Sequence, residues 1–147
     1  MKIAIGNDHA AVDMKNEIVE FLLDKGYEVE NFGTDTLTSC NYPDYAKRVS
    51  EAVITNSCDC GILICGTGAG MAIAANKFKG IRAASVSDAT TARLIKEHNN
   101  ANIITFGARI VGAEAAKDIV DAYLNAQFLG GRHQNRIDLI TQLEEAK

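Results

Sequence analysis

A cysteine followed by a glycine-rich loop is the segment of this 147-residue chain with the clearest chemical potential. Cys65 ends an apolar run, and it is followed by Gly66-Thr67-Gly68-Ala69-Gly70. Alternating glycines let backbone N–H groups approach a ligand closely. The positive end of the helix that follows favours a phosphate or an oxyanion. Because a helix N-terminus also favours the thiolate form of a cysteine, Cys65 is a candidate thiolate beside an anion-binding loop.

The residues alone leave three roles open for Cys65. It can be an inert buried thiol, which is common for an unpaired cysteine. It can remove a proton alpha to a carbonyl while the loop stabilises the enediolate, or it can be the nucleophile of an acyl transfer. A dinucleotide site is a weaker interpretation, because the G-x-G-x-x-G fingerprint requires glycine where Met71 stands and belongs after the first strand.

Other polar residues follow segments that are predicted to be strands. Asp8 and His9 follow the first such segment, and Arg109 follows the last. The carboxyl ends of parallel strands meet at one edge of a sheet, where ligands bind. We therefore expect Asp8, His9, Cys65, Thr67 and Arg109 to converge. Helix capping is a sufficient explanation for the remaining polar residues at strand ends, Asp35, Ser87 and Asp88.

Two further groups of polar residues lie later in the chain. His98 and Asn99 end a predicted helix, where they can bind a ligand or act only as a dipole partner and a helix stop. Arg132 and Arg136 are four residues apart, so they share a helix face and suit a phosphate, unless they only form a solvated charged face. The preceding Gly130-Gly131 indicates a break that turns the last helix into an arm.

The alternation of apolar runs and helical periods predicts the elements that must position these residues. In the first helix, Ala11, Met14, Ile18 and Leu22 form the apolar stripe and Lys15 faces away from it, and Lys25-Gly26 ends the helix. The predicted strands are 3–5, 28–32, 61–65, 81–86 and 102–106. The later helices are predicted at 43–56, 69–78, 88–98, 113–126 and 133–146. This order predicts an α/β, Rossmann-like three-layer sandwich, with a five-stranded parallel sheet and helices on both faces.

Composition narrows the classes of function. The length fits one compact domain, and a net charge of −4 argues against a nucleic-acid partner. No apolar run approaches the roughly 18 residues that span a membrane, and the N-terminus does not have the pattern of a signal peptide. The four cysteines lack the paired C-x-x-C pattern of a zinc site. We expect a cytoplasmic protein with reduced thiols and no bound metal.

With these segments assembled, the sequence closely resembles the type B ribose-5-phosphate isomerases, a family that also contains galactose-6-phosphate isomerase. The similarity covers nearly the whole chain, and several linked motifs in order are more specific than any one loop. The motifs are Asp8-His9, Tyr42-Pro43-Asp44, Ile64-Cys65-Gly66-Thr67-Gly68-Ala69-Gly70, Ile73-Ala74-Ala75-Asn76-Lys77, Gly80-Ile81-Arg82-Ala83, Glu97-His98-Asn99, Phe106-Gly107-Ala108-Arg109, and Gly130-Gly131-Arg132-His133 with Arg136.

The resemblance implies an aldose–ketose isomerase that interconverts ribose 5-phosphate and ribulose 5-phosphate through an enediolate, without metal or organic cofactor. It implies that Cys65 is the proton-abstracting base and that His98 helps to open the sugar ring. The substrate-binding residues it implies are Asp8, His9, Gly66, Thr67, Gly68, Ala69, Gly70 and Asn99, with Arg109, Arg132 and Arg136 near the phosphate.

The resemblance also implies a homodimer, or a tetramer of paired dimers, with sites at the dimer interface. A single domain over residues 1–147 then carries an arm from about residue 130 that packs on the partner subunit. One departure is visible, since the family often has a glycine soon after Asp-His and this chain has Ala10-Ala11. Family branches without the cysteine use a carboxylate base elsewhere, so Cys65 places this chain in the cysteine branch.

Two alternatives remain beside this prediction. The first is an isomerase of a six-carbon sugar phosphate, such as allose 6-phosphate or galactose 6-phosphate, because one more carbon changes the length of the pocket rather than the chemistry. The second is a module that binds a nucleotide at the glycine loop and catalyses nothing, so that Cys65 would have no role.

Overall fold

A parallel sheet forms the centre of the molecule in the computed structural model, which describes residues 1–146. Its strands are β1 (Lys2–Asn7), β2 (Glu28–Asn31), β3 (Cys60–Cys65), β4 (Ala83–Ser85) and β5 (Ile103–Gly107). They lie in the order β2-β1-β3-β5-β4, and every pair is parallel. The predicted five-stranded parallel sheet is confirmed, although β4 is shorter than the predicted strand.

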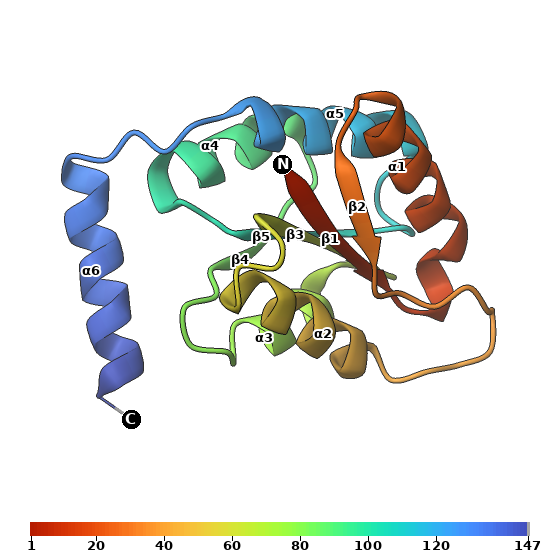
Figure 1. Ribbon diagram of the computed structural model, residues 1–147, viewed down its shortest axis with the longest axis horizontal. Coiled ribbons are helices and arrows are strands. Elements are labelled where there is room, and N and C mark those ends of the chain that lie inside the picture. The colour runs from red at the N-terminus through yellow and green to blue at the C-terminus, as the bar shows by residue number, and fades with distance from the viewer. Residues whose placement is uncertain (147) are drawn as a thin grey trace.

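Helices cover both faces of the sheet (Figure 1). On one face lie α1 (Val12–Asp24), α4 (Ala89–Asn99) and α5 (Ala113–Asn125), and on the other lie α2 (Tyr42–Ile54) and α3 (Ala69–Ala75). Pro43 lies in the first turn of α2, and the side chain of Asp88 caps α4 by accepting from the Thr91 N–H at 2.7 Å, both as predicted. The Rossmann-like three-layer sandwich is therefore confirmed.

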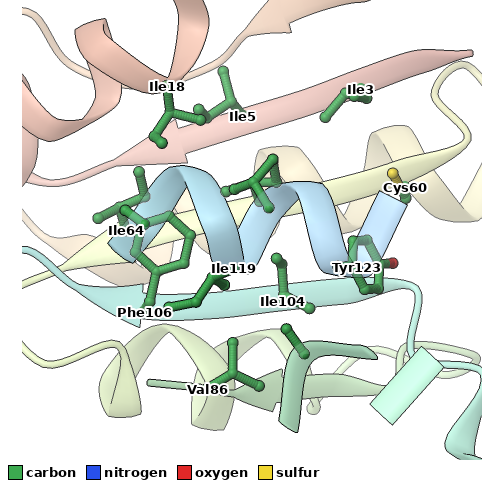
Figure 2. Close-up of a cluster of buried hydrophobic side chains, with 14 of the residues drawn as sticks. Ile3, Ile5, Ile18, Cys60, Ile64, Val86, Ile104, Phe106, Ile119 and Tyr123 are labelled. Atoms are coloured by element: carbon green, nitrogen blue, oxygen red, sulfur yellow. The ribbon is translucent and has the colours of Figure 1, made fainter. Parts of the chain in front are cut away.

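Burial of apolar side chains between these layers holds the sheet in place. All six residues of β3 are buried, as expected for a strand covered on both faces. Figure 2 shows Ile5, Ile64 and Phe106 of the sheet gathered with Ile119 of α5. Each of these side chains is fully buried, and full burial of such a side chain stabilises a fold by roughly 1.5–3 kcal/mol.

One prediction about the first helix is wrong. Lys15 was expected to face water, but its side chain is fully buried. Its ammonium group is paired with the carboxylate of Asp35, in the loop that follows β2. Asp35 therefore anchors this loop to α1 and does not cap a helix, since α2 begins after Asn41. Periodicity missed this arrangement because a buried charge depends on a partner that is distant in sequence.

The last helix, α6 (Arg132–Glu145), stands apart from the three layers, beyond α4 (Figure 1). Gly130 and Gly131 precede it with φ values of +64° and +57°, a conformation that favours glycine. The predicted break before the last helix is thus confirmed. Among the described residues, no helix has the length and apolar character needed to cross a membrane.

The order of the strands defines where a ligand is expected. The connection from β1 to β2 runs through α1 on one face, and the connection from β2 to β3 runs through α2 on the other. The chain therefore reverses its direction across the sheet between β1 and β3. In open α/β sheets, ligands bind at such a point, outside the carboxyl ends of the strands. Asp8 and Cys65 lie at this place.

Candidate active site

The thiol of Cys65 lies against the loop that follows it. Cys65 is the last residue of β3 and is 5% exposed. The backbone N–H of Gly68 donates to its Sγ, with an N–S distance of 3.2 Å. Gly68 is also bonded to β5, because the hydroxyl of Thr105 donates to the Gly68 carbonyl at 2.7 Å. A backbone amide directed at a sulfur is a donor that stabilises negative charge on it.

Close approach of two backbones explains why the loop needs its glycines. Gly68 has a φ of +83°, and a Cβ on it would lie 2.8 Å from the Cα of Phe106. A Cβ on Gly107 would lie 2.6 Å from the carbonyl oxygen of Gly66. Any side chain at either position would separate the loop from β5. The loop can therefore keep the Gly68 amide aimed at Cys65 only with glycine at these two positions.

Asp8 and His9 reach the same edge from β1. The N–H of Asp8 donates to the carbonyl of Ile64 at 3.2 Å, which places Asp8 beside the end of β3. His9 starts a short 3-10 turn (His9–Ala11), so the unusual Ala10-Ala11 is part of this turn. The Nδ1 atom of His9 accepts from the N–H of Cys40 at 3.3 Å. A neutral His9 therefore carries its proton on Nε2, where it can donate to a ligand.

Arg109 completes this edge from β5. Its N–H donates to the carbonyl of Gly66 at 3.0 Å. Its Nη1 atom lies 3.1 Å from the position that a Cβ on Gly66 would occupy, so the guanidinium group rests on the loop. Within residues 1–146, no carboxylate lies within ion-pair distance of Arg109. The structure thus places Asp8, His9, Cys65, Thr67 and Arg109 at the carboxyl ends of three adjacent strands.

Two neighbouring residues were not among the predicted site residues. The ring of Tyr42 lies over Gly70, since a Cβ on Gly70 would be 2.9 Å from the Cζ of the tyrosine. Asn7 is fully buried, and its Nδ2 donates to the carbonyls of Asp8 at 2.9 Å and Thr34 at 3.0 Å. Tyr42 belongs to the Tyr42-Pro43-Asp44 motif, which could have drawn attention to it. Asn7 stood directly beside Asp8 in the sequence.

A second cluster forms around the end of α4. The rings of His98 and His133 are stacked, with centroids 4.4 Å apart and an angle of 12° between their planes. The N–H of Leu129 donates to the carbonyl of Glu97 at 3.0 Å, which fixes the start of the arm to the same helix end. Asn99 ends α4, and Arg132 and Arg136 are exposed on α6.

The two clusters lie at opposite ends of the strands, one at the carboxyl ends and one at the amino ends. The N–H of Gly61, at the start of β3, donates to the carbonyl of Asn102 at 2.9 Å, so the end of α4 lies near the amino end of β3. Cys65 lies at the carboxyl end of this six-residue strand. At ~3.3 Å per residue, it is about 16 Å from the first residue of the strand, Cys60. Within one chain, His98, Asn99, Arg132 and Arg136 are therefore not brought to Cys65.

An open groove of about 380 Å³ lies beside the second cluster, between α6 and the body of the molecule. Its apolar lining comes from α4, β4 and α6, and it includes Ile95, Ala84, Ile140 and Leu143. Asn99 and Arg82 also line it. The groove thus lies at the amino edge of the sheet, away from Cys65.

Comparison with known proteins identifies the family of this chain. The model of the family described as Ribose/Galactose Isomerase matches residues 3–140. The chain belongs to this family. It is 50% identical over 146 residues to ribose-5-phosphate isomerase B of Escherichia coli strain K12, which covers 99% of this chain and 98% of that protein.

Two other members of the ribose/galactose isomerase family are informative. The structure of ribose-5-phosphate isomerase B from Clostridium thermocellum superposes with a TM-score of 0.98, at 51% identity and 99% coverage of both chains. D-erythrulose-4-phosphate isomerase of Pectobacterium atrosepticum is 43% identical over 145 residues, 98% of this chain and 95% of that protein. The predicted family, fold and isomerase class are confirmed, whereas the substrates for which the relatives are named differ.

In the second cluster, His133 makes the stability of the fold depend on pH. Burial lowers the pKa of His133, and the positive charges of His98, Arg132 and Arg136 lower it further. Between this lowered pKa and the ordinary value near 6.5, the unfolded chain binds more protons than the folded chain. Stability must therefore fall as the pH falls through that interval.

We expect the melting temperature of the wild-type protein to drop when the pH is lowered from about 7.5 to about 5.5, and the drop to be smaller in His133→Gln. The variant has no imidazole at this position to protonate in the unfolded chain. Thermal unfolding of both proteins across this pH range is the measurement. Equal drops in the two proteins would contradict a lowered pKa at His133.

Proposed function

We propose that this chain interconverts ribose 5-phosphate and ribulose 5-phosphate, with Cys65 as the base. The observation that carries the proposal is the Gly68 amide directed at the Cys65 sulfur, 3.2 Å away, at the edge of the sheet where Asp8, His9 and Arg109 follow the neighbouring strands. A thiolate held next to the backbone N–H groups of a glycine-rich loop suits proton removal beside a carbonyl. The ribose-5-phosphate isomerase B relatives support the same reaction.

The chemistry moves one proton between two carbons. The Cys65 thiolate takes the proton from C2 of the open-chain aldose, and the electron pair of that bond forms the C1–C2 double bond of the enediolate. The negative charge goes to O1, where the loop amides and the hydroxyl of Thr67 stabilise it. The thiol then returns the proton to C1, and the proton of O2 moves to O1. The product is the ketose, with its carbonyl at C2 and a hydroxyl group at C1.

A complete site needs two copies of the chain, because His98 lies at the edge opposite Cys65. In the homodimer that we propose, the His98 end of one chain meets the Cys65 loop of the other. His98 then opens the sugar ring, and Asn99 binds the sugar. The same arrangement takes Arg132 and Arg136 from the chain opposite to the one that supplies Cys65 and Arg109.

The exposed face of α6 supports such a partner. Leu139, Ile140 and Leu143 are 59%, 41% and 69% exposed, and they extend the apolar lining of the groove beside α4. Exposed apolar patches of this kind commonly mark contacts with another protein. A second copy that covers them would bury the arm, as proposed for the residues from about 130 onward. Two such dimers can pair as a tetramer.

Charge explains how an acidic chain can bind a phosphate. The net charge is −4, but Arg109, Arg132 and Arg136 lack carboxylate partners within ion-pair distance among residues 1–146. In the proposed dimer they meet around the same end of the substrate. Guanidinium groups bind phosphate oxygens in a bidentate geometry, which favours a phosphorylated sugar over the free sugar.

A six-carbon sugar phosphate is the second candidate, because the ribose/galactose isomerase family spans both sugar types in its description. We expect kcat/KM for ribose 5-phosphate to exceed that for allose 6-phosphate and galactose 6-phosphate by about 10-fold or more, the effect of roughly 1.4 kcal/mol in transition-state binding. Steady-state rates with the three substrates test this. A higher kcat/KM with either six-carbon phosphate would reassign the substrate and leave the isomerase chemistry in place.

The remaining features of the proposal concern setting and cofactors. All four cysteines are free, which suits a reducing compartment, so we propose that the enzyme acts in the cytoplasm, in the pentose phosphate pathway. We propose that the reaction uses no metal or organic cofactor, and no nucleic acid or membrane as partner. The nucleotide-binding alternative has less support, since Met71 is fully buried where a fingerprint glycine would stand.

A further inference from the structure

Arg82 has no role in the reaction as described so far, yet it is bonded to the end of α4. Its Nη2 donates to the carbonyl of Asn100 at 2.9 Å. Its Nε lies 3.1 Å from the same oxygen and 3.2 Å from the carbonyl oxygen of Asn99. The planar guanidinium group thus binds the two carbonyls that directly follow His98. Cationic groups favour this end of a helix because its free carbonyls carry partial negative charge.

The turn that Arg82 holds is an unfavourable one. Asn100 has a φ of +45° and is one of the non-glycine residues in the left-handed region. Its N–H donates to the carbonyl of Lys96 at 3.1 Å, and the N–H of Ala101 donates to that of Ile95 at 3.2 Å. These bonds occupy the preceding carbonyls of the helix end. Arg82 supplies the donors for the carbonyls of Asn99 and Asn100, which the helix itself cannot satisfy.

Arg82 is itself fixed on both sides in the chain. Its N–H donates to Oδ1 of Asn102 at 2.8 Å, and Nδ2 of Asn102 donates to the carbonyl of Gly80 at 2.8 Å. The next residue, Ala83, exchanges two hydrogen bonds of 2.8 Å with the side chain of Asn76, at the end of α3. Because the backbone at Arg82 is held in this way, its guanidinium group can keep the end of α4 in place and does not move with it.

We propose that Arg82 is a positioning residue, which sets the place of His98 and Asn99 by binding the carbonyls of Asn99 and Asn100. This inference rests on the proposed function, because it assigns Arg82 to the His98 side of the two-chain site. His98 and Asn99 are the last residues of α4, where helices fray. Any loosening of this end moves both side chains, and a shift of about 1 Å can cost roughly 10²-fold in rate.

The test uses Arg82→Gln, Arg82→Lys and the matched control Arg93→Gln. Arg93 also makes a hydrogen-bonded pair at α4, but it is a residue of this helix and bonds the Glu97 carboxylate, not the carbonyls at the helix end. We expect Arg82→Gln to lower kcat for ribose 5-phosphate by ~10- to 100-fold. Arg82→Lys retains the charge and a single donating nitrogen, so its kcat should fall less than that of Arg82→Gln. Arg93→Gln should change kcat by no more than about twofold, as expected for an exposed ion pair.

Combination with His98→Asn separates positioning from general loss of structure. If Arg82 acts through His98 and Asn99, the double variant should lose much less than the product of the two single losses, because one of the two groups that Arg82 positions is already gone. A general weakening of the fold would instead multiply the two losses. An unchanged kcat in Arg82→Gln, or fully multiplied losses in the double variant, would overturn the inference.

A measurement without substrate keeps the inference testable on its own. The chain has only three histidines, so their ring protons can be assigned in NMR spectra by single substitutions. We expect Arg82→Gln to shift the signals of His98 and of His133, which is stacked on it. Unchanged His98 signals would also overturn the inference. If the wild-type protein isomerises no sugar phosphate, the proposed function fails, whereas these spectra still decide the positioning role.

Discussion

Replacement of Cys65 by alanine is expected to lower kcat for ribose 5-phosphate by about 10²- to 10⁴-fold, the usual contribution of a positioned acid–base group. Alanine removes the thiol and the hydrogen bond that it accepts from the Gly68 amide, but the bond from the Thr105 hydroxyl to the Gly68 carbonyl still holds the loop. KM should change little, because binding depends on the loop and the arginines. Steady-state kinetics and thermal unfolding of the variant are the measurements.

Cys60→Ala provides the matched control for this variant. Cys60 begins the same strand that Cys65 ends, and it is also buried, at 4% exposure. Burial raises its pKa to about 12, so it remains a neutral thiol at any working pH. We expect this control to keep near-normal turnover. Loss of activity in Cys60→Ala, or its survival in Cys65→Ala, would show that the base has been assigned to the wrong residue.

A mixed dimer of two inactive variants is expected to regain activity. Cys65→Ala supplies an intact His98 end, and His98→Asn supplies an intact Cys65 loop. If each site combines the Cys65 loop of one chain with the His98 end of the other, the mixed dimer contains one intact site. Its kcat per dimer should therefore be about half that of the wild-type dimer, since a two-fold dimer has two equivalent sites.

The mixed dimer can be isolated by co-expressing the two variants with different affinity tags and purifying on both. Each variant dimer alone should stay near the background rate, which gives a wide range over which recovery is visible. A site contained within one chain predicts that the purified mixed dimer is as inactive as its parents. Failure to recover any doubly tagged species would contradict the proposed homodimer itself.

Most of the fold followed from local patterns in the sequence. Apolar runs such as that before Cys65 have to lie between two layers of helices, and Gly130-Gly131 has to break the chain because of its backbone freedom. Lys15 did not follow from such a pattern. Its burial depends on Asp35, twenty residues away in the chain, and periodicity within one helix carries no information about that pairing.

The site followed from the sequence only in part. Residues after strand ends were correctly grouped, because parallel strands bring their carboxyl ends to one edge. His98 was linked to Cys65 by family resemblance alone, and its place at the amino edge became visible only with the course of α4. Arg82 was part of a recognised motif, but its target is two backbone carbonyls, which leave no mark on the pattern of side chains.

The most direct measurement of the central claim is deuterium exchange during turnover. Ribose 5-phosphate is incubated in D₂O with the wild-type protein or with Cys65→Ala, and the C2 proton is followed by NMR. A thiolate that carries the proton between C2 and C1 exchanges it with solvent over many turnovers. The account predicts that the wild-type protein replaces this proton by deuterium and that Cys65→Ala does not do so on the same timescale. Conversion to ribulose 5-phosphate with the original hydrogen fully retained at equilibrium would contradict it.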